Sequence, residues 1–293
     1  LKKHEPACFL AALLNSQPMG FYGPSQLVQD AQRHGVEVLP VDVLRSDWDC
    51  TLEGDVAVRL GLRMVSGLTQ AMAQRLTAVR VSRSFARIED LALCAKLDQG
   101  DLKALASADA LHSLSGHRRQ QVWDASALHR APRLLQEAPI HESRLLLPHA
   151  AEGEEVIHDY ATTGLTLRAH PLQLLREQLS NLKLMTAAQL RVLPNGRLVR
   201  AAGIVIMRQR PGTAKGVTFV TLEDETGSVN VIVWKALAER QRTELLHARL
   251  LVVHGTWQRD VDSGGQVCHL IAGFLRDLTP LLGGLTTQSR EFH

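Results

Sequence analysis

Two groups of carboxylates come closest to the spacing of a metal site. Asp42, Asp47 and Asp49 lie in a segment that follows an extended stretch, and residues 223–225 (EDE) lie at a corner between a strand and a turn. A divalent cation needs several oxygen ligands at a defined spacing, with further carboxylate or histidine support. Neither group has that support, and the histidines form no HxH or HExxH pattern. We therefore expect no metal site and no catalytic residue in this chain.

The segment GLRMVSGLTQAMAQRL (61–76) has the features of a phosphate-binding helical hairpin. Apolar residues lead into a tight turn at Ser66, Gly67 and Leu68, and a helical stretch follows. Backbone N–H groups at the start of a helix bind phosphate oxygens, because the N-terminus of a helix carries partial positive charge. An ordinary helical bundle with a glycine-containing turn is the alternative interpretation.

A second hairpin is indicated at LKALASADALHSL (102–114). Asp109 stands where the turn glycine is expected, which argues against phosphate binding at this turn. Across residues 59–123, basic side chains outnumber acidic ones by about two to one, and this surplus favours a surface that faces DNA phosphates. Arg118 and Arg119 are the candidate contacts at the end of this tract.

Basic and aromatic residues also gather around a later hairpin. Arg208, Arg210 and Lys215 flank a Pro-Gly pair, and Phe219 follows on the next extended stretch. Single-stranded nucleic acid binds through a basic groove combined with aromatic stacking, which contributes ~1–3 kcal/mol per stacked base. We expect the three cations to lie on a loop that projects from the fold and contacts a single strand.

Composition limits the function classes. The chain has 293 residues, 45% hydrophobic content and a net charge of +3, and this mild basicity alone does not establish a nucleic-acid partner. The four cysteines lie far apart without a CxxC pair, which argues against a zinc site and favours reduced thiols in the cytoplasm. No apolar run reaches the roughly 18 residues of a membrane span. The absence of an initiating Met indicates part of a longer protein.

Helical periodicity dominates the first half of the chain. Residues 6–16 and 26–34 are predicted helices, and an extended segment follows at 36–43. Four short helices with short connections are then predicted between residues 56 and 128, which is typical of a compact helical cluster. Their ranges are 69–80, 87–96, 100–108 and 116–128, and a further helical segment is predicted at 170–182.

At about residue 197 the pattern changes from helical to alternating. Five strands with one helix between the third and the fourth, in the order β-β-β-α-β-β, are typical of an OB-fold barrel. Gly203 lies inside the first strand, where a small barrel needs a bend, and we expect Trp234 and Trp257 in the core. The predicted strands are 199–210, 216–224, 228–234, 248–258 and 266–278, with the helix at 235–246 and a turn at 262–265.

Longer runs of residues resemble one protein family. LKKHEPACFLAALLNSQPMGFYGPSQLVQDAQRHGVEV is similar to the late fingers region of the bacterial C-family DNA polymerases, the DNA polymerase III alpha-subunit family. QPMGFY and SDWDC resemble its error-prone, damage-inducible branch. LASADALHSLSGHRRQQVW resembles the tandem hairpin region of that branch, EEVIHDYATTGLTLRAHPLQLLR its connector, RQRPGTAKGVTFVTLEDETGSVNVIVW its OB-fold and SREFH its C-terminus. The chain is identified as a C-terminal part of such a polymerase.

The resemblance implies a DNA-directed DNA polymerase that acts in translesion synthesis and induced mutagenesis, with Mg²⁺ held by palm aspartates. No run here matches the palm motif, so this fragment is expected to be inactive alone and to bind no cofactor. The implied partners are primer–template duplex and single-stranded template, an inactive Y-family-like mutagenesis protein, a RecA-like mutagenesis protein and, indirectly, the sliding clamp. The implied duplex contacts are Ser66, Gly67 and Leu68, and the implied template contacts are Arg208, Arg210 and Lys215.

These observations predict a multidomain α+β fold that consists of a fingers remnant, a helical helix-hairpin-helix domain, a helical connector and a C-terminal OB-fold β-barrel. A stand-alone single-strand-binding or scaffold protein without enzymatic activity is the alternative. An anticodon-binding OB-fold of a synthetase is a third possibility, against which the hairpin tract argues. The predicted domains are residues 1–55, 56–130, 131–196 and 197–280, with a tail at 281–293.

Overall fold

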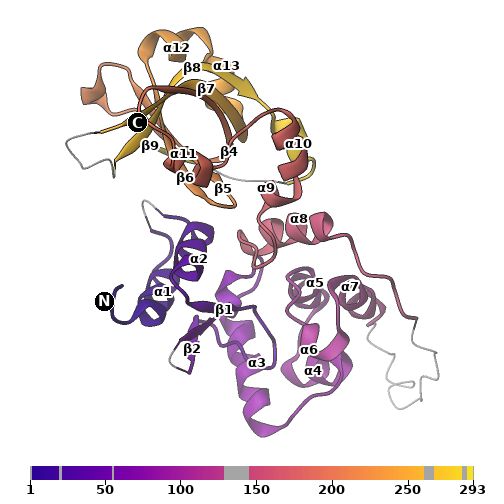
Figure 1. The fold of residues 1–293 in the computed structure, drawn as a ribbon. Helices are drawn as coiled ribbons and strands as arrows, with labels where there is room; N and C mark the ends of the chain where they lie inside the picture. The colour runs from indigo at the N-terminus through magenta and orange to yellow at the C-terminus, as the bar shows by residue number, and fades with distance from the viewer. Residues whose placement is uncertain are drawn as a thin grey trace. The chain divides into compact units, whose positions relative to one another are not determined.

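A computed structural model describes residues 2–19, 22–54, 56–128, 145–260, 267–285 and 289–292. The chain divides into two compact units, Leu1–Leu167 and Arg168–His293. In Figure 1 the first unit is mainly helical, in indigo to pink, and the second contains the β-barrel, in brown to yellow. The turn predicted at 262–265 and the first part of the segment predicted at 131–196, up to residue 144, lie outside the described residues.

The first unit begins with two helices and a small sheet. Helices α1 (Pro6–Asn15) and α2 (Pro24–Arg33) both carry proline in the first turn, where the missing N–H costs no helical hydrogen bond. The sheet has the strand order β1-β3-β2, with β1 (Glu37–Leu39) parallel and β2 (Thr51–Glu53) antiparallel to β3 (Ala57–Arg59).

Short helices complete the first unit and share a single hydrophobic core with α1 and the sheet. This core extends from Ala7 to Leu165, so the domain boundary predicted between residues 55 and 56 falls inside it. That division of the chain stays a prediction. The helices are η1 (Leu62–Met64), α3 (Gln70–Ser82), α4 (Ile88–Ala95), α5 (Gln99–Ser107), α6 (His112–Ser115), α7 (Arg118–Ala127) and α8 (Glu152–Thr163), which confirms the four predicted helices of this region within about two residues.

The second unit is a closed five-stranded barrel with a helical entry segment. The strand order is β5-β6-β8-β7-β4, and β4 also pairs with β5, which closes the barrel. The predicted OB-fold is therefore confirmed. The barrel strands are β4 (Arg197–Gln209), β5 (Thr218–Asp224), β6 (Gly227–Val233), β7 (Leu250–Arg259) and β8 (Cys268–Asp277), and the other elements are α9 (Pro171–Leu174), α10 (Arg176–Asn181), α11 (Ala187–Arg191), η3 (Gly212–Ala214), α12 (Lys235–Arg240), α13 (Arg242–His247), η4 (Thr279–Leu282) and β9 (Arg290–Phe292).

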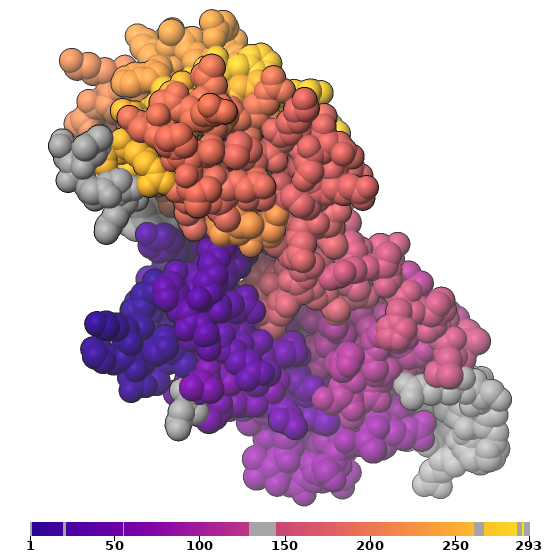
Figure 2. All heavy atoms as spheres, viewed as in Figure 1, coloured from indigo at the N-terminus to yellow at the C-terminus, as the bar shows by residue number. Residues whose placement is uncertain are grey.

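Alternating apolar residues fill the barrel, whose outer surface is drawn with all heavy atoms in Figure 2. A Cβ at Gly203 would lie 2.7 Å from the Cβ of Leu222, so the predicted mid-strand glycine is required by the close approach of β5. Gly255 meets the same constraint, since its Cβ would lie 2.0 Å from the carbonyl oxygen of Ile271.

Two predicted segments differ in detail. The single helix expected at 235–246 is broken at Gln241, because the side-chain amide of Gln241 pairs with both backbone groups of Leu275 at 2.8 Å, as a neighbouring strand does. The segment predicted as a tail contributes β9, which lies parallel to the end of β4.

Candidate nucleic-acid interface

The outer face of β5 and β6 carries an exposed aromatic residue among polar ones. Phe219 lies opposite Ile232, and Thr221 lies opposite Asn230, so these four side chains share one face of the sheet. The side chain of Phe219 is 38% exposed. This face is the one through which OB-folds usually bind oligonucleotides.

Trp234 follows the last residue of β6, and it is 55% exposed. The expectation that Trp234 belongs to the core is wrong, whereas Trp257, at 2% exposure, is confirmed as a core residue. The phase of β6 explains the difference. Val231 and Val233 point inward, so the alternation of the strand places the next residue, Trp234, outside.

The loop between β4 and β5 adds positive charge beside this face. Arg210 and Lys215 are exposed, and Lys215 has a left-handed backbone with a φ of 48°. Lys235 packs over the same loop, since a Cβ at Gly216 would lie 3.1 Å from its side chain. Sequence reasoning missed Lys235, which the contact with Gly216 brings to the loop. These three cations and the two exposed aromatic residues form the barrel interface: Arg210, Lys215, Phe219, Trp234 and Lys235.

Arg208 does not lie on the projecting loop, so its predicted position is wrong. It is only 6% exposed. Its guanidinium donates hydrogen bonds to the carbonyl oxygens of Leu245 and Ala248, at the C-terminal end of α13, and to the hydroxyl of Ser289. The last carbonyls of a helix lack partners within the helix, and a cation placed there interacts favourably with the negative end of the helix dipole. Arg208 is therefore a C-terminal cap of α13.

The first predicted hairpin has the expected turn. Ser66 and Gly67 are exposed, Gly67 has a φ of 88°, and Leu68 is half-buried. Thr69 caps α3 by accepting a hydrogen bond from the N–H of Met72 at 3.2 Å. The N–H of Ser66, however, donates to the carbonyl oxygen of Thr162 at 2.8 Å and is not available to a ligand. The candidate phosphate contacts of this turn are therefore the N–H groups of Gln70 and Ala71 at the start of α3, which have no partner within the helix.

The second predicted hairpin has the expected turn but not a turn that favours phosphate binding. Asp109 has a φ of 60°, so it takes the left-handed conformation in which glycine was expected. Its carboxylate accepts a hydrogen bond from the side-chain amide of Gln121 at 2.6 Å. A negative charge at the turn repels phosphate, and this turn is therefore structural.

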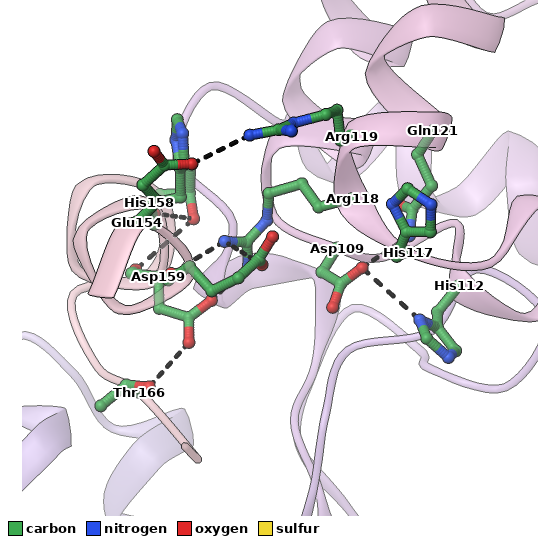
Figure 3. A network of polar contacts seen from close by, with 12 residues as sticks. Asp109, His112, His117, Arg118, Arg119, Gln121, Glu154, His158, Asp159 and Thr166 are labelled. Atoms are coloured by element: carbon green, nitrogen blue, oxygen red, sulfur yellow. Dashed lines mark hydrogen bonds and ion pairs between the residues drawn. The ribbon is translucent and has the colours of Figure 1, made fainter. Parts of the chain in front are cut away.

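Arg118 is not on the surface, so its predicted role as a DNA contact conflicts with its position. It is 3% exposed. Figure 3 shows its guanidinium pointing from α7 toward α8, where it pairs with Asp159 and lies 2.9 Å from the carboxylate of Glu155. Asp159 in turn accepts a hydrogen bond from Thr166 at 2.7 Å. Arg119 is exposed and pairs with Glu154 at 3.0 Å (Figure 3).

Most of the described arginines of the first unit also pair with a carboxylate, so much of the basic surplus in the sequence is engaged in ion pairs, and a phosphate-facing surface stays a prediction. Their carboxylate partners come from other elements of the unit, so the pairs hold the unit together. The pairs are Arg59 with Glu53, Arg63 with Asp49 at 2.7 Å, Arg75 with Asp101 at 3.5 Å and Arg80 with Asp47 at 2.7 Å.

The acidic groups considered as metal sites also have structural partners. Asp224 accepts hydrogen bonds from the backbone of Ala187 and Thr226, both at 2.7 Å. Burial acts to raise the pKa of Glu225, but the guanidinium of Arg176, which donates two hydrogen bonds to it at 2.6 and 2.8 Å, holds the pKa below its usual value. Within the described ranges, no group of three or more His, Cys, Asp or Glu residues is arranged to hold a metal ion.

The comparisons with known proteins agree with this geometry. The family model described as "Helix-hairpin-helix motif" matches residues 35–121, and the one described as "OB-fold nucleic acid binding domain" matches residues 193–272. The whole chain is 52% identical to an "Error-prone DNA polymerase" of Ralstonia nicotianae, 54% identical to one of Burkholderia pseudomallei and 50% identical to one of Methylococcus capsulatus.

The chain spans only part of these relatives. It covers 28% of the Ralstonia and Burkholderia proteins and 30% of the Methylococcus protein. The resemblance stated from the sequence is confirmed by these matches.

No helix in the described part of the chain has the length and apolar character that a bilayer span requires.

Proposed function

Because this chain is homologous over its whole length to one part of the error-prone DNA polymerases, we propose that it binds and positions DNA for such an enzyme. The observation that carries the proposal is the barrel interface, where Phe219 and Trp234 are exposed beside the cations Arg210 and Lys215. Aromatic faces stack on the bases of a single strand, and the cations contact its phosphates. The barrel thereby holds single-stranded template.

The helical hairpin supplies the second contact of the proposal. The start of α3 offers backbone N–H groups to a phosphate of duplex DNA, and this contact carries no sequence information. Gly67 permits the turn because its φ of 88° is strained for any other residue. Duplex and single strand thus engage different units of the chain.

The finer proposal concerns the whole enzyme. We assign it translesion synthesis in induced mutagenesis, in the cytoplasm, with an inactive Y-family-like protein, a RecA-like protein and an indirect clamp contact as partners. Mg²⁺ would supply the metal chemistry of nucleotidyl transfer. We propose that its ligands lie in another part of the enzyme and that this chain alone is inactive, which the lack of a metal-holding group of His, Cys, Asp or Glu among the described residues supports.

Binding of labelled oligothymidylate to the full chain tests the barrel interface. Phe219→Leu and Trp234→Leu should each weaken binding by about fivefold or more, because each removes a stacking surface. Trp123→Leu is the matched control, since Trp123 is also exposed, at 52%, but lies on α7 of the first unit. Unchanged affinity in both barrel variants would contradict the proposal.

Two further measurements test the hairpin and the inactivity. Gly67→Val should weaken binding to duplex DNA several-fold and leave the affinity for single strand unchanged, because it strains only the turn before α3. Gly164→Val is the control, because Gly164 also has a positive φ, of 73°, at the end of α8.

A primer-extension assay with Mg²⁺ and four nucleotides should show no product, and template-dependent extension by this chain would refute its inactivity.

A further inference from the structure

A second row of exposed side chains crosses the barrel on strands β4, β7 and β8. Arg200 lies directly opposite His254, and His254 lies directly opposite Phe274. Residues paired in this way project from the same face of a sheet. Arg200 is exposed, Phe274 is 46% exposed, and its ring lies 5.4 Å from the imidazole of His254. The row therefore presents one cation and two rings side by side.

A second arginine lies beside this row. Arg276 is exposed and pairs with Val252, two residues along β7 from His254. Within the described residues, no carboxylate pairs with Arg200 or Arg276, in contrast to most arginines of the first unit. Burial first, and then the charges of Arg200 and Arg276, lower the pKa of His254. Both guanidinium groups therefore act on the same imidazole, and their mutual repulsion is not relieved by an acidic neighbour.

This row is distinct from the barrel interface. In the closed barrel, β7 is separated from β6 by β8 and from β5 by β4. The outer face of β7 therefore points away from the outer face of β5 and β6, where Phe219 lies. The outer side chains involved are those of even-numbered residues on β4 and β7, since Val199, Ala201 and Val253 face the core.

We propose that the row of Arg200, His254, Phe274 and Arg276 is a second contact surface for single-stranded DNA. This inference rests on the proposed function, because it assumes that the barrel engages a single strand. Phe274 offers a face for base stacking, as aromatic residues on open sheet surfaces do in RNA-binding modules. Arg200 and Arg276 stand two strands apart, about 10 Å, so they contact different phosphates of one strand. A strand held on β5 and β6 continues around the barrel to this row.

The test uses the full chain and a labelled oligothymidylate of about ten nucleotides, a length within the range bound by one OB-fold. The double variant Arg200→Gln and Arg276→Gln should bind about tenfold more weakly. Its log–log salt dependence should be flatter by roughly 1.4, about 0.7 for each lost phosphate contact. The control double variant Arg240→Gln and Arg242→Gln removes the same charge from exposed positions on α12 and α13.

Phe274 and His254 give two further readouts, one of base stacking and one of the approach of a phosphate. Phe274→Leu should weaken binding about fivefold with an unchanged salt slope, and Phe274→Tyr should restore affinity, because only stacking is altered. The pKa of His254, followed by NMR, should rise when the oligonucleotide binds, because phosphates offset the charges of Arg200 and Arg276. Arg200, Arg276 and Phe274 are the groups that face this imidazole from β4 and β8.

The outcomes separate this inference from the proposed function. If the Arg200 and Arg276 variant and Phe274→Leu keep wild-type affinity while Phe219→Leu loses it, the second surface is wrong and the barrel interface stands. If only the second-surface variants lose affinity, the barrel interface is wrong and this inference stands. If the wild-type chain binds no oligonucleotide, both are wrong.

Discussion

In the helical unit, Arg118 and Arg80 each pair with a carboxylate from a distant part of the chain, whereas Arg210 and Arg200 on the barrel are exposed and pair with no carboxylate among the described residues. The first two arginines thus stabilise the fold of their unit, whereas the other two are available to bind a ligand. A guanidinium that is already paired gains little from a phosphate, since it must first lose its carboxylate. We therefore expect the proposed DNA affinity of this chain to depend on unpaired cations rather than on the number of arginines.

The largest effect should come from breaking the buried pair of the helical unit. Arg118→Ala leaves the carboxylates of Glu155 and Asp159 buried without their counter-charge, which costs about 3–5 kcal/mol of unfolding free energy. Urea denaturation should show this loss. Arg119→Ala, on the neighbouring exposed pair, should change stability by less than about 1 kcal/mol. Equal effects of the two substitutions would mean that the buried pair is not structural.

Arg208 is an exception to the contrast between paired arginines in the helical unit and exposed arginines on the barrel, because it lies in the barrel and has a structural role. Arg208→Ala leaves the carbonyls of Leu245 and Ala248 without their donor, and hydrogen bonds to charged groups contribute about 1.5–3 kcal/mol. We expect a destabilisation of about 2–3 kcal/mol by thermal or urea unfolding. Arg210→Ala, two residues away, should stay within about 0.5 kcal/mol of the wild type. The reverse order of stabilities would refute the capping role.

The elements themselves were predictable because their periodicity is local. The five barrel strands and α3 follow from alternating and helical patterns, and Gly203 marked the close approach inside the first strand. The exposure of Trp234 could also have been predicted from the sequence. Counting the inward residues Val231 and Val233 would have placed Trp234 outside.

The partners of the arginines were not predictable, because they lie far away along the sequence. Asp159 lies 41 positions after Arg118 in the sequence, and Leu245 lies 37 positions after Arg208. A bulge between Val205 and Met207 also shifts the register of β4 just before Arg208. Sequence therefore located the barrel loop but did not separate Arg208, which caps a helix, from Arg210, which is exposed.

A moderate effect on DNA binding, with none on folding, is expected for the exposed loop. The double variant Arg210→Ala and Lys215→Ala should weaken oligothymidylate binding by about tenfold and flatten the salt slope by roughly 1.4. Its melting temperature should match the wild type, because both side chains are exposed. Anisotropy titrations at several salt concentrations measure both quantities. Wild-type affinity and slope would mean that unpaired charge on this loop is not what binds DNA.

The smallest effect should come from the partly buried ion pair of Arg176 and Glu225 in the barrel unit. Arg176 donates two hydrogen bonds to the carboxylate of Glu225, so Arg176→Gln should cost about 1 kcal/mol at neutral pH. The folded pKa of Glu225 is lowered, despite the opposing effect of burial. The pair therefore stabilises the fold above the unfolded carboxyl pKa of about 4.3, and that contribution is lost as the pH falls through the lower folded pKa.

The wild-type and Arg176→Gln unfolding curves should accordingly differ at neutral pH and converge in acid. Arg119→Gln is the control, because its pair with Glu154 is exposed and should give nearly superimposed curves at every pH. A constant gap between wild type and Arg176→Gln at all pH values would show that Arg176 acts by packing instead of by charge. In that case the contrast between the units would be stronger, since the barrel would then hold no ion pair of measurable strength at this position.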